Sequence, residues 1–380
     1  MNGAMELPIS RSANAQLDEL LEEICVALQI TDTQYDQAKE HYKTVGKWLS
    51  AEGSFLASLQ PNIYPQGSAR LGTTVKPRHQ EEHDVDLICH MEIPPNLYPE
   101  PGTVLNLVEA RLNQSGHYKG KVEPYKRCVR INYANEFHLD ITPARRDPSR
   151  AGSCILVPDR KIKQWKPSNP IGYAEWFERQ TDRQKRAMAD RKIAPFPAQE
   201  PAKRKGSLRR AVQLLKRHRD IVFNGSDDAP RSIALTTLAG HHYEGQDLTT
   251  DALMGILDNV ADYIERTPGA IEIPNPSNNA EKLCESWQND PEAYDAFVEF
   301  IRQFRRHFRS IIGTIGLDRI ADRLNDLFGE KITRKAVASL TGRVNQARAE
   351  NQIHYGGTLV GISASTPSTR PVPPNTFYGR

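Results

Sequence analysis

Two neighbouring stretches decide the fold of this chain: YPQGSARLGTTV at residues 64–75 and EHDVDLI at residues 82–88. The second stretch alternates polar and apolar residues, which is typical of a strand buried on one face. Successive side chains of a strand point to opposite faces, so Asp84 and Asp86 share one face while Val85 faces the other. Two adjacent carboxylates repel each other, and a divalent cation between them removes that cost. Hard oxygen ligands of this kind suit Mg²⁺.

A second alternation of this type occurs at residues 137–142, with the sequence FHLDIT. His138 and Asp140 share one face of this expected strand, and the apolar residues supply the buried face. If the two strands are neighbours, Asp140 becomes a third carboxylate beside Asp84 and Asp86. Three aspartates on adjacent strands can hold two metal ions ~3.5–4 Å apart. We therefore predict that Asp84, Asp86 and Asp140 are catalytic and bind two Mg²⁺ ions, with Mn²⁺ as a substitute.

Gly67 and Ser68 form a turn that precedes the aspartates in the chain. Glycine lets the backbone approach a ligand closely, and the neighbouring N–H groups with the Ser68 hydroxyl can bind phosphates. The turn is not a Walker loop, since no Gly-Lys-Ser or Gly-Lys-Thr follows the glycines. A lone Gly-Ser or Asp-x-Asp is weak evidence. Their order along the chain, completed by Asp140, indicates a functional site for metal and phosphate.

This ordered set resembles the signature of the polymerase-β-like nucleotidyltransferases, and more narrowly that of the bacterial CD-NTases, the cGAS/DncV-like cyclic-oligonucleotide synthases. Residues 66–73 (QGSARLGT) and 83–87 (HDVDL) carry the active-site part of the resemblance, which many nucleotidyltransferases share. The helical segment 210–220 (RAVQLLKRHRD) and the Asn-Pro segment 274–287 narrow it to the CD-NTases. The resemblance covers most of the chain, from Leu17 to Ile312.

The resemblance implies an enzyme that joins nucleoside triphosphates, ATP and/or GTP, into a cyclic di- or trinucleotide second messenger and releases pyrophosphate. The setting would be antiphage signalling of the CBASS type. By match to the motif, the nucleotide-binding residues would be Gln66, Gly67, Ser68, Lys216 and Ser232. In some similar systems a ubiquitin-activating-like partner attaches the C-terminus to other molecules, so a CBASS accessory or conjugating protein at the C-terminus is a partner to test.

The periodicity of the rest of the chain agrees with an α+β, bilobal polymerase-β-like fold. The pattern is helical from Ala13 to Leu56, where Thr31 or Asp32 would cap a second helix, and we expect a long N-terminal spine helix that joins the lobes. A mixed sheet follows, and helices dominate from residue 172 onward, among them 207–223 and 278–287. The predicted division is a catalytic core with N-terminal helices at 1–170, a helical lobe at 171–360 and a disordered tail at 361–380.

Composition places the chain among ordinary globular proteins. Of 380 residues, 38% are hydrophobic and 26% charged, and the net charge is +3. No apolar run approaches the ~20 residues of a membrane-spanning helix, and the N-terminus lacks a signal-peptide pattern, so we expect a cytoplasmic protein with no membrane partner. The five cysteines have no paired spacing, which argues against a disulfide framework or a Cys-x-x-Cys zinc site.

Two other functions stay open at this point. The same fold could add nucleotides to an RNA end or to a protein hydroxyl. A degenerate site could instead make the chain a non-catalytic nucleotide- or RNA-sensing protein, although the intact aspartate set argues against this. Direct nucleic-acid binding by the arginines around Phe304 and Phe308 also stays open, but aromatics interleaved on a helix are more often core residues.

Overall fold

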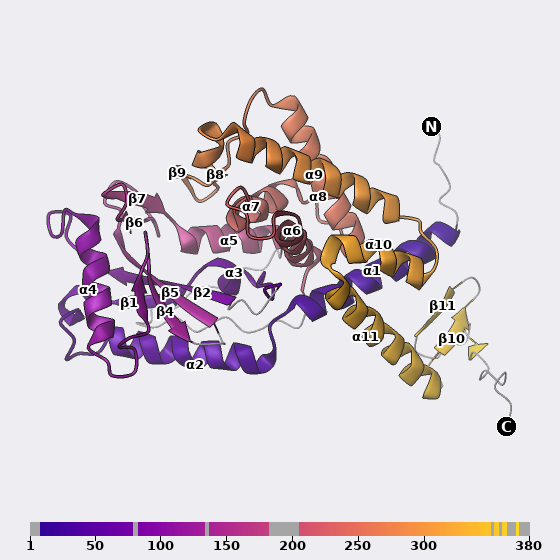
Figure 1. The fold of residues 1–380 in the computed structure, drawn as a ribbon, viewed down its shortest axis with the longest axis horizontal. Helices are drawn as coiled ribbons and strands as arrows, with labels where there is room; N and C mark the ends of the chain where they lie inside the picture. The colour runs from indigo at the N-terminus through magenta and orange to yellow at the C-terminus, as the bar shows by residue number, and fades with distance from the viewer. Residues whose placement is uncertain are drawn as a thin grey trace.

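The chain folds into a sheet lobe and a helical lobe, each with its own hydrophobic core, as expected for a bilobal α+β enzyme (Figure 1). The fold is that of a computed structural model. It describes residues 8–78, 83–133, 137–181, 205–350, 353–356, 359–362 and 370–371.

The sheet lobe contains a mixed sheet of seven strands in the order β1-β2-β5-β4-β3, and β6 joins β5 to β7. β2 and β5 pair in parallel, and the other neighbours are antiparallel. The strands are β1 (Asn62–Pro65), β2 (His83–Met91), β3 (Val122–Pro124), β4 (Val129–Tyr133), β5 (Phe137–Arg146), β6 (Ile155–Asp159) and β7 (Gln164–Ser168).

Two helices cover the apolar face of this sheet: α2 (Asp32–Leu49) and α4 (Pro101–Asn113). Figure 1 shows α2 along one side of the sheet and α4 at the edge farthest from the helical lobe. Burying each large apolar side chain in such a core contributes roughly 1.5–3 kcal/mol. The opposite face carries the polar residues of the same strands, together with a small apolar cluster of Tyr64, Ile88 and Ala144 against which Ile171 packs. The buried face consists of alternating strand residues, among them Val85, Leu87, Cys89, Val129, Ile131, Leu139 and Ile141.

The helical lobe is built around α6 (Ser207–Phe223), which begins and ends at the residues predicted from its periodicity. Leu208, Leu214 and Leu215 of α6 are buried, so the helix lies inside the lobe and not on its surface. The surrounding helices are α1 (Pro8–Leu28), α5 (Pro170–Thr181), α7 (Ser232–His242), α8 (Thr249–Arg266), α9 (Pro291–Ile311), α10 (Leu317–Phe328) and α11 (Glu330–Ala349).

The expected spine is not a single helix. α1 ends at Leu28, and Thr31 starts α2 with a capping box: its side chain accepts from the Gln34 backbone, and the Gln34 side chain accepts from the Thr31 backbone. The apolar stripe of α1 belongs to the core of the helical lobe, and that of α2 belongs to the core of the sheet lobe. The N-terminal segment therefore joins the lobes through the short bend between two helices.

The helix predicted at 278–287 is wrong. Residues there form β9 (Asn278–Lys282), which pairs with β8 (Pro274–Asn275), and a short 3-10 helix at Glu285–Gln288. Asn275 accepts a hydrogen bond from the Ser277 backbone, and Asn278 accepts one from the Ala280 backbone. Such local asparagine bonds compete with helical ones and favour a turn.

The C-terminal part of the described chain adds a small sheet of β10 (Ile353–Gly356), β11 (Leu359–Ile362) and β12 (Arg370–Pro371). The remainder of the predicted tail, 363–369 and 372–380, lies outside the described residues, as does most of the loop before α6. The division of the chain at residue 170 stays a prediction. No helix among the described residues combines the length and apolarity needed to cross a bilayer.

Candidate active site

Three neighbouring strands align a row of charged residues on the polar face of the sheet. The parallel register of β2 and β5 sets Asp86 opposite Asp140, and the antiparallel register of β5 and β4 sets Asp140 opposite Arg130. Asp84 lies two residues before Asp86, and therefore on the same face. The structure thus brings together the three aspartates that the sequence singled out, because β2 and β5 are neighbours.

The carboxylates differ in their surroundings. Burial, together with the negative charges of Asp140 and Asp84, raises the pKa of Asp86 to about 7. Burial also raises the pKa of Asp84, although the Arg130 charge opposes this shift. Asp86 thus lies in a site with an excess of negative charge, which a divalent cation would neutralise.

Arg130 is a site residue that the sequence reasoning missed. Its guanidinium makes a bidentate pair with Asp140, with nitrogen–oxygen distances of 2.7 and 2.8 Å, and approaches Asp84 at 3.0 Å. The alternation at residues 129–133 was a usable signal, since it places Arg130 on the polar face of its strand. The sequence alone does not show that Arg130 lies opposite Asp140, because this depends on the register of β4 against β5.

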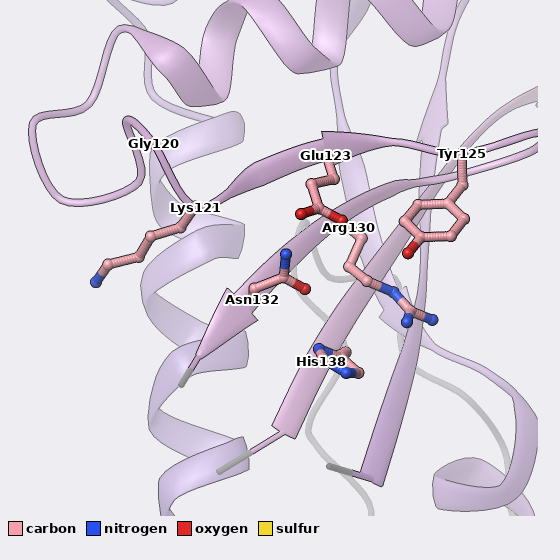
Figure 2. Close-up of a pocket in the computed structure, with 7 residues that line it drawn as sticks. All are labelled: Gly120, Lys121, Glu123, Tyr125, Arg130, Asn132 and His138. Carbon is pink, nitrogen blue, oxygen red and sulfur yellow. The ribbon is translucent and has the colours of Figure 1, made fainter. Parts of the chain in front are cut away.

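Arg130, which pairs with Asp140, also lines a hollow of about 510 Å³, and Figure 2 shows the side chains around it. The ring of Tyr125 stands next to the guanidinium, with its centroid 4.7 Å from Cζ. The hollow therefore continues the polar face of the sheet toward its β3 edge. Its other lining residues are Gly120, Lys121, Glu123, Asn132 and His138.

Gly67 brings the predicted phosphate turn directly against Asp86. Its φ of 61° is in the left-handed region, which glycine adopts without strain. The backbone N–H of Gln66 donates to the carbonyl oxygen of Asp86 at 2.8 Å, which fixes the turn to β2. The short helix α3 (Gly67–Leu71) follows, and the Ser68 hydroxyl accepts from the Thr74 hydroxyl at 3.4 Å.

Helix α6 holds the loop after α3 from the side of the helical lobe. Lys216 donates to the backbone carbonyl and the hydroxyl of Thr73, at 3.2 and 3.0 Å. One and two turns earlier, Gln213 donates to the carbonyl of Thr74 at 2.8 Å and Arg209 to that of Leu71 at 3.1 Å. Burial, together with the positive charge of Arg219, lowers the pKa of Lys216 to about 7. The helix thus presents a buried lysine that an approaching anion would convert to its charged form.

Ser232 begins α7 on the far wall of the same cleft. Arg219 of α6 donates to its hydroxyl at 2.9 Å and also pairs with Asp220. Arg219 and Asp220 are not in the predicted site, because nothing in the sequence separates a charged residue of this helix that lines a cleft from one that is only solvated.

A cleft of about 700 Å³ connects these elements between the lobes. Of the predicted site residues, Gly67, Ser68, Asp84, Asp86, Lys216 and Ser232 line it. Gln66 and Asp140 are not among its lining residues, although Gln66 adjoins the turn and Asp140 the aspartate pair. The cleft therefore joins carboxylates, a glycine turn and a buried lysine in one space.

The carboxylate oxygens of the three aspartates are suitable ligands for a hard divalent cation. Arg130 forms ion pairs with both Asp84 and Asp140, so these two carboxylates lie close enough to share one cation. Among the residues that the structure describes, no three His, Cys, Asp or Glu side chains are already grouped as metal ligands. The aspartates are therefore arranged around an arginine, and their chemistry suits Mg²⁺ or Mn²⁺.

Comparison with known protein families agrees with this geometry. Residues 12–180 match the family model described as the Second Messenger Oligonucleotide or Dinucleotide Synthetase domain. The matched segment contains Gly67, Ser68 and the three aspartates.

Two characterised proteins resemble the chain over nearly its full length. A protein of Roseivirga ehrenbergii named c-di-GMP synthase is 34% identical over 375 residues, which cover 98% of this chain and 99% of that protein. The cyclic dinucleotide synthase CdnG of Bradyrhizobium diazoefficiens is 25% identical, with 90% of this chain and 88% of that protein covered.

The solved structure of that Bradyrhizobium CdnG, in complex with GTP, has the same fold. Its TM-score to this chain is 0.70 at 24% identity, and the match covers 86% of this chain and 99% of that one.

Proposed function

Because the chain belongs to the bacterial CD-NTase family of nucleotidyltransferases, we propose that it is a cyclic dinucleotide synthase that uses GTP and makes cyclic di-GMP. The c-di-GMP synthase of Roseivirga, 34% identical over almost the whole chain, supports the choice of product. The GTP complex of Bradyrhizobium CdnG supports the choice of substrate. The reaction joins a ribose hydroxyl to an α-phosphate and releases pyrophosphate.

The observation that carries the proposal is the row of Asp86, Asp140 and Arg130 across three strands, next to a left-handed glycine turn. Asp84, Asp86 and Asp140 would hold two Mg²⁺ ions. When bound, these ions activate the attacking hydroxyl and neutralise charge on the triphosphate.

The chain's own cleft residues position the substrate. The backbone of Gly67 and the hydroxyl of Ser68 face the cleft and would bind the triphosphate beside the aspartates. Lys216 lies on the opposite wall, where a phosphate would favour its charged form. Ser232, held by Arg219, would contact the donor nucleotide. Such catalysis is mostly orientation and charge stabilisation.

Mass spectrometry of products formed from mixed triphosphates tests this function. We expect GTP to be consumed and a phosphatase-resistant product with the mass of cyclic di-GMP to accumulate. Asp84→Asn and Asp86→Asn should each lower the rate by on the order of 10³-fold, because each removes one charged metal ligand. Asp262→Asn, on the surface of α8, should retain full activity and serves as the matched control.

Two other outcomes would point to the alternatives. Products that grow on an added RNA end, or that remain attached to protein, would favour a linear nucleotidyltransferase. GTP binding without turnover would favour a nucleotide sensor. The CBASS setting and a conjugating partner at the C-terminus stay predictions, which deletion of residues 363–380 in a phage-challenge assay would test.

A further inference from the structure

Arg130 places a fixed positive charge where Asp84 and Asp140 meet. Its Nε and Nη2 atoms donate to the two oxygens of Asp140 at 2.7 and 2.8 Å, and Nη2 lies 3.0 Å from Oδ1 of Asp84. Bidentate pairs of this kind are about twice as strong as neutral hydrogen bonds. Both oxygens of Asp140 are therefore engaged by a cation that belongs to the chain itself.

The surroundings hold Arg130 in this position. The β4–β5 register sets its backbone directly opposite that of Asp140, so the side chains lie side by side on one face. The Tyr125 ring stacks near the guanidinium on the side of the hollow (Figure 2). The side chain of Arg130 is 18% exposed and that of Asp140 is 13% exposed, so water screens this pair only weakly. A guanidinium keeps its charge at every pH at which the protein is folded.

A divalent ion that binds the carboxylate oxygens of Asp140 lies close to the positive charge of Arg130. Each oxygen of Asp140 accepts one hydrogen bond from Arg130 and has a second lone pair for an ion. An ion bound there would share the carboxylate with the guanidinium, and the two positive charges repel each other at such short distances. A triphosphate changes this balance, because its negative charge offsets the repulsion and its oxygens offer the guanidinium another bidentate acceptor.

We propose that Arg130 is the resident counter-cation of the catalytic carboxylates: it neutralises them in the metal-free protein, competes with divalent ions for them, and so makes tight metal binding depend on the triphosphate. The inference rests on the metal site proposed above. Arg130 is thus a positioning residue, which acts on the substrate through Asp84 and Asp140.

Mn²⁺ binding to the full-length chain tests this directly, with free Mn²⁺ measured by electron paramagnetic resonance and no nucleotide present. Arg130→Met should bind Mn²⁺ roughly tenfold tighter than the unaltered protein, since a competing charge is removed. A non-hydrolysable GTP analogue should tighten binding to the unaltered protein and shrink this difference. Arg127→Met is the matched control, because it breaks another arginine–aspartate pair, with Asp159, and should bind like the unaltered protein.

Thermal unfolding, first with a chelator and then with excess Mn²⁺, provides the second measurement. Arg130→Met should melt at a lower temperature than the unaltered protein, because three carboxylates lose their neutralising charge, and Mn²⁺ should restore the loss. If Arg130→Met does not fold, Arg130→Lys replaces it: lysine keeps the charge but loses the bidentate pair, so Mn²⁺ affinity should rise by a smaller factor.

Two outcomes separate a failure of the proposed role of Arg130 from a failure of the metal site. A folded Arg130→Met or Arg130→Lys variant that binds Mn²⁺ no tighter than the unaltered protein overturns the role of Arg130 and leaves the metal site standing. Absence of Mn²⁺ binding in all proteins, with and without the GTP analogue, overturns the metal site and this inference together.

Discussion

The carboxylate of Asp86 lies so close to Gly67 that a Cβ atom on residue 67 would come within 3.0 Å of Oδ2, a distance that real Cβ atoms essentially never show. The glycine turn is therefore packed directly against the side chain of Asp86 in β2. Any side chain at residue 67 would push the turn away from the aspartates or rotate Asp86.

Gly67→Ala should abolish product formation. The new methyl group clashes with Asp86, and the left-handed backbone at 61° adds a strain of roughly 1–2 kcal/mol for a residue with a side chain. The rate of product formation measures the effect of the clash on activity, and thermal unfolding measures the loss of stability from backbone strain. Gly53→Ala is the matched control, since nothing lies within 4 Å of its added Cβ, and it should behave like the unaltered protein. Full activity of Gly67→Ala would contradict the proposed contact.

Binding of GTP should take up a proton through Lys216. Its pKa is lowered to about 7, chiefly by burial, so above pH 7 the amine of the free protein is mostly neutral. The triphosphate stabilises the charged form, and its affinity should therefore fall as the pH rises from 7 to 9, by at most about tenfold per unit.

Calorimetric titration in two buffers of different ionisation enthalpy, without metal, counts the protons. Lys216→Met should bind GTP more weakly and with less proton uptake. Lys282→Met, at a half-exposed position on β9, should leave both quantities unchanged. Equal proton uptake by Lys216→Met and the unaltered protein would assign the proton to another group.

His218 should make the protein less stable in mild acid. Burial lowers its pKa from 6.5 to about 4, and its Nδ1 donates to the carbonyl of Leu327 at 3.0 Å. In the unfolded chain His218 binds a proton below pH 6.5, whereas in the folded protein it stays neutral down to about pH 4. This group therefore stabilises the fold fully above pH 6.5, and its contribution of up to about 3 kcal/mol is lost as the pH falls toward 4.

Urea unfolding at a series of pH values tests this window. His218→Asn keeps a hydrogen-bond donor but does not titrate, so its stability should depend less on pH between 6.5 and 4. The pH slope is the informative quantity, because loss of the ring contacts with Phe300 and Phe304 lowers stability at every pH. Parallel curves for the two proteins would exclude His218 as the source.

The capping box at the bend between α1 and α2 should stabilise the fold. Thr31→Ala removes an acceptor for the N–H of Gln34 at 3.2 Å and should cost about 1 kcal/mol of unfolding free energy. Chemical denaturation measures it. Thr341→Ala, which removes an exposed hydroxyl within α11, should change stability by less than about 0.5 kcal/mol. A Thr31→Ala variant as stable as the unaltered protein would show that packing alone sets the bend.

Local patterns in the sequence determined much of the site. The two-residue period of a strand was enough to place Asp84 and Asp86 on one face, because that period is a property of the backbone itself. The bounds of α6 followed in the same way from its apolar spacing. The glycine turn was predicted for its freedom of φ, and the structure gives Gly67 a left-handed φ of 61°.

Tertiary structure decided which of these segments meet. The pairing of Asp86 with Asp140, and of Asp140 with Arg130, depends on strand register, which packing of the apolar face selects and no local pattern encodes. The expected spine became two helices because their apolar stripes enter two different cores. The roles of the site residues stay predictions until the variants are measured. The sequence determined which face of its strand each charged residue occupies. Only the pairing of strands that are distant in the sequence placed Arg130 beside Asp84 and Asp140.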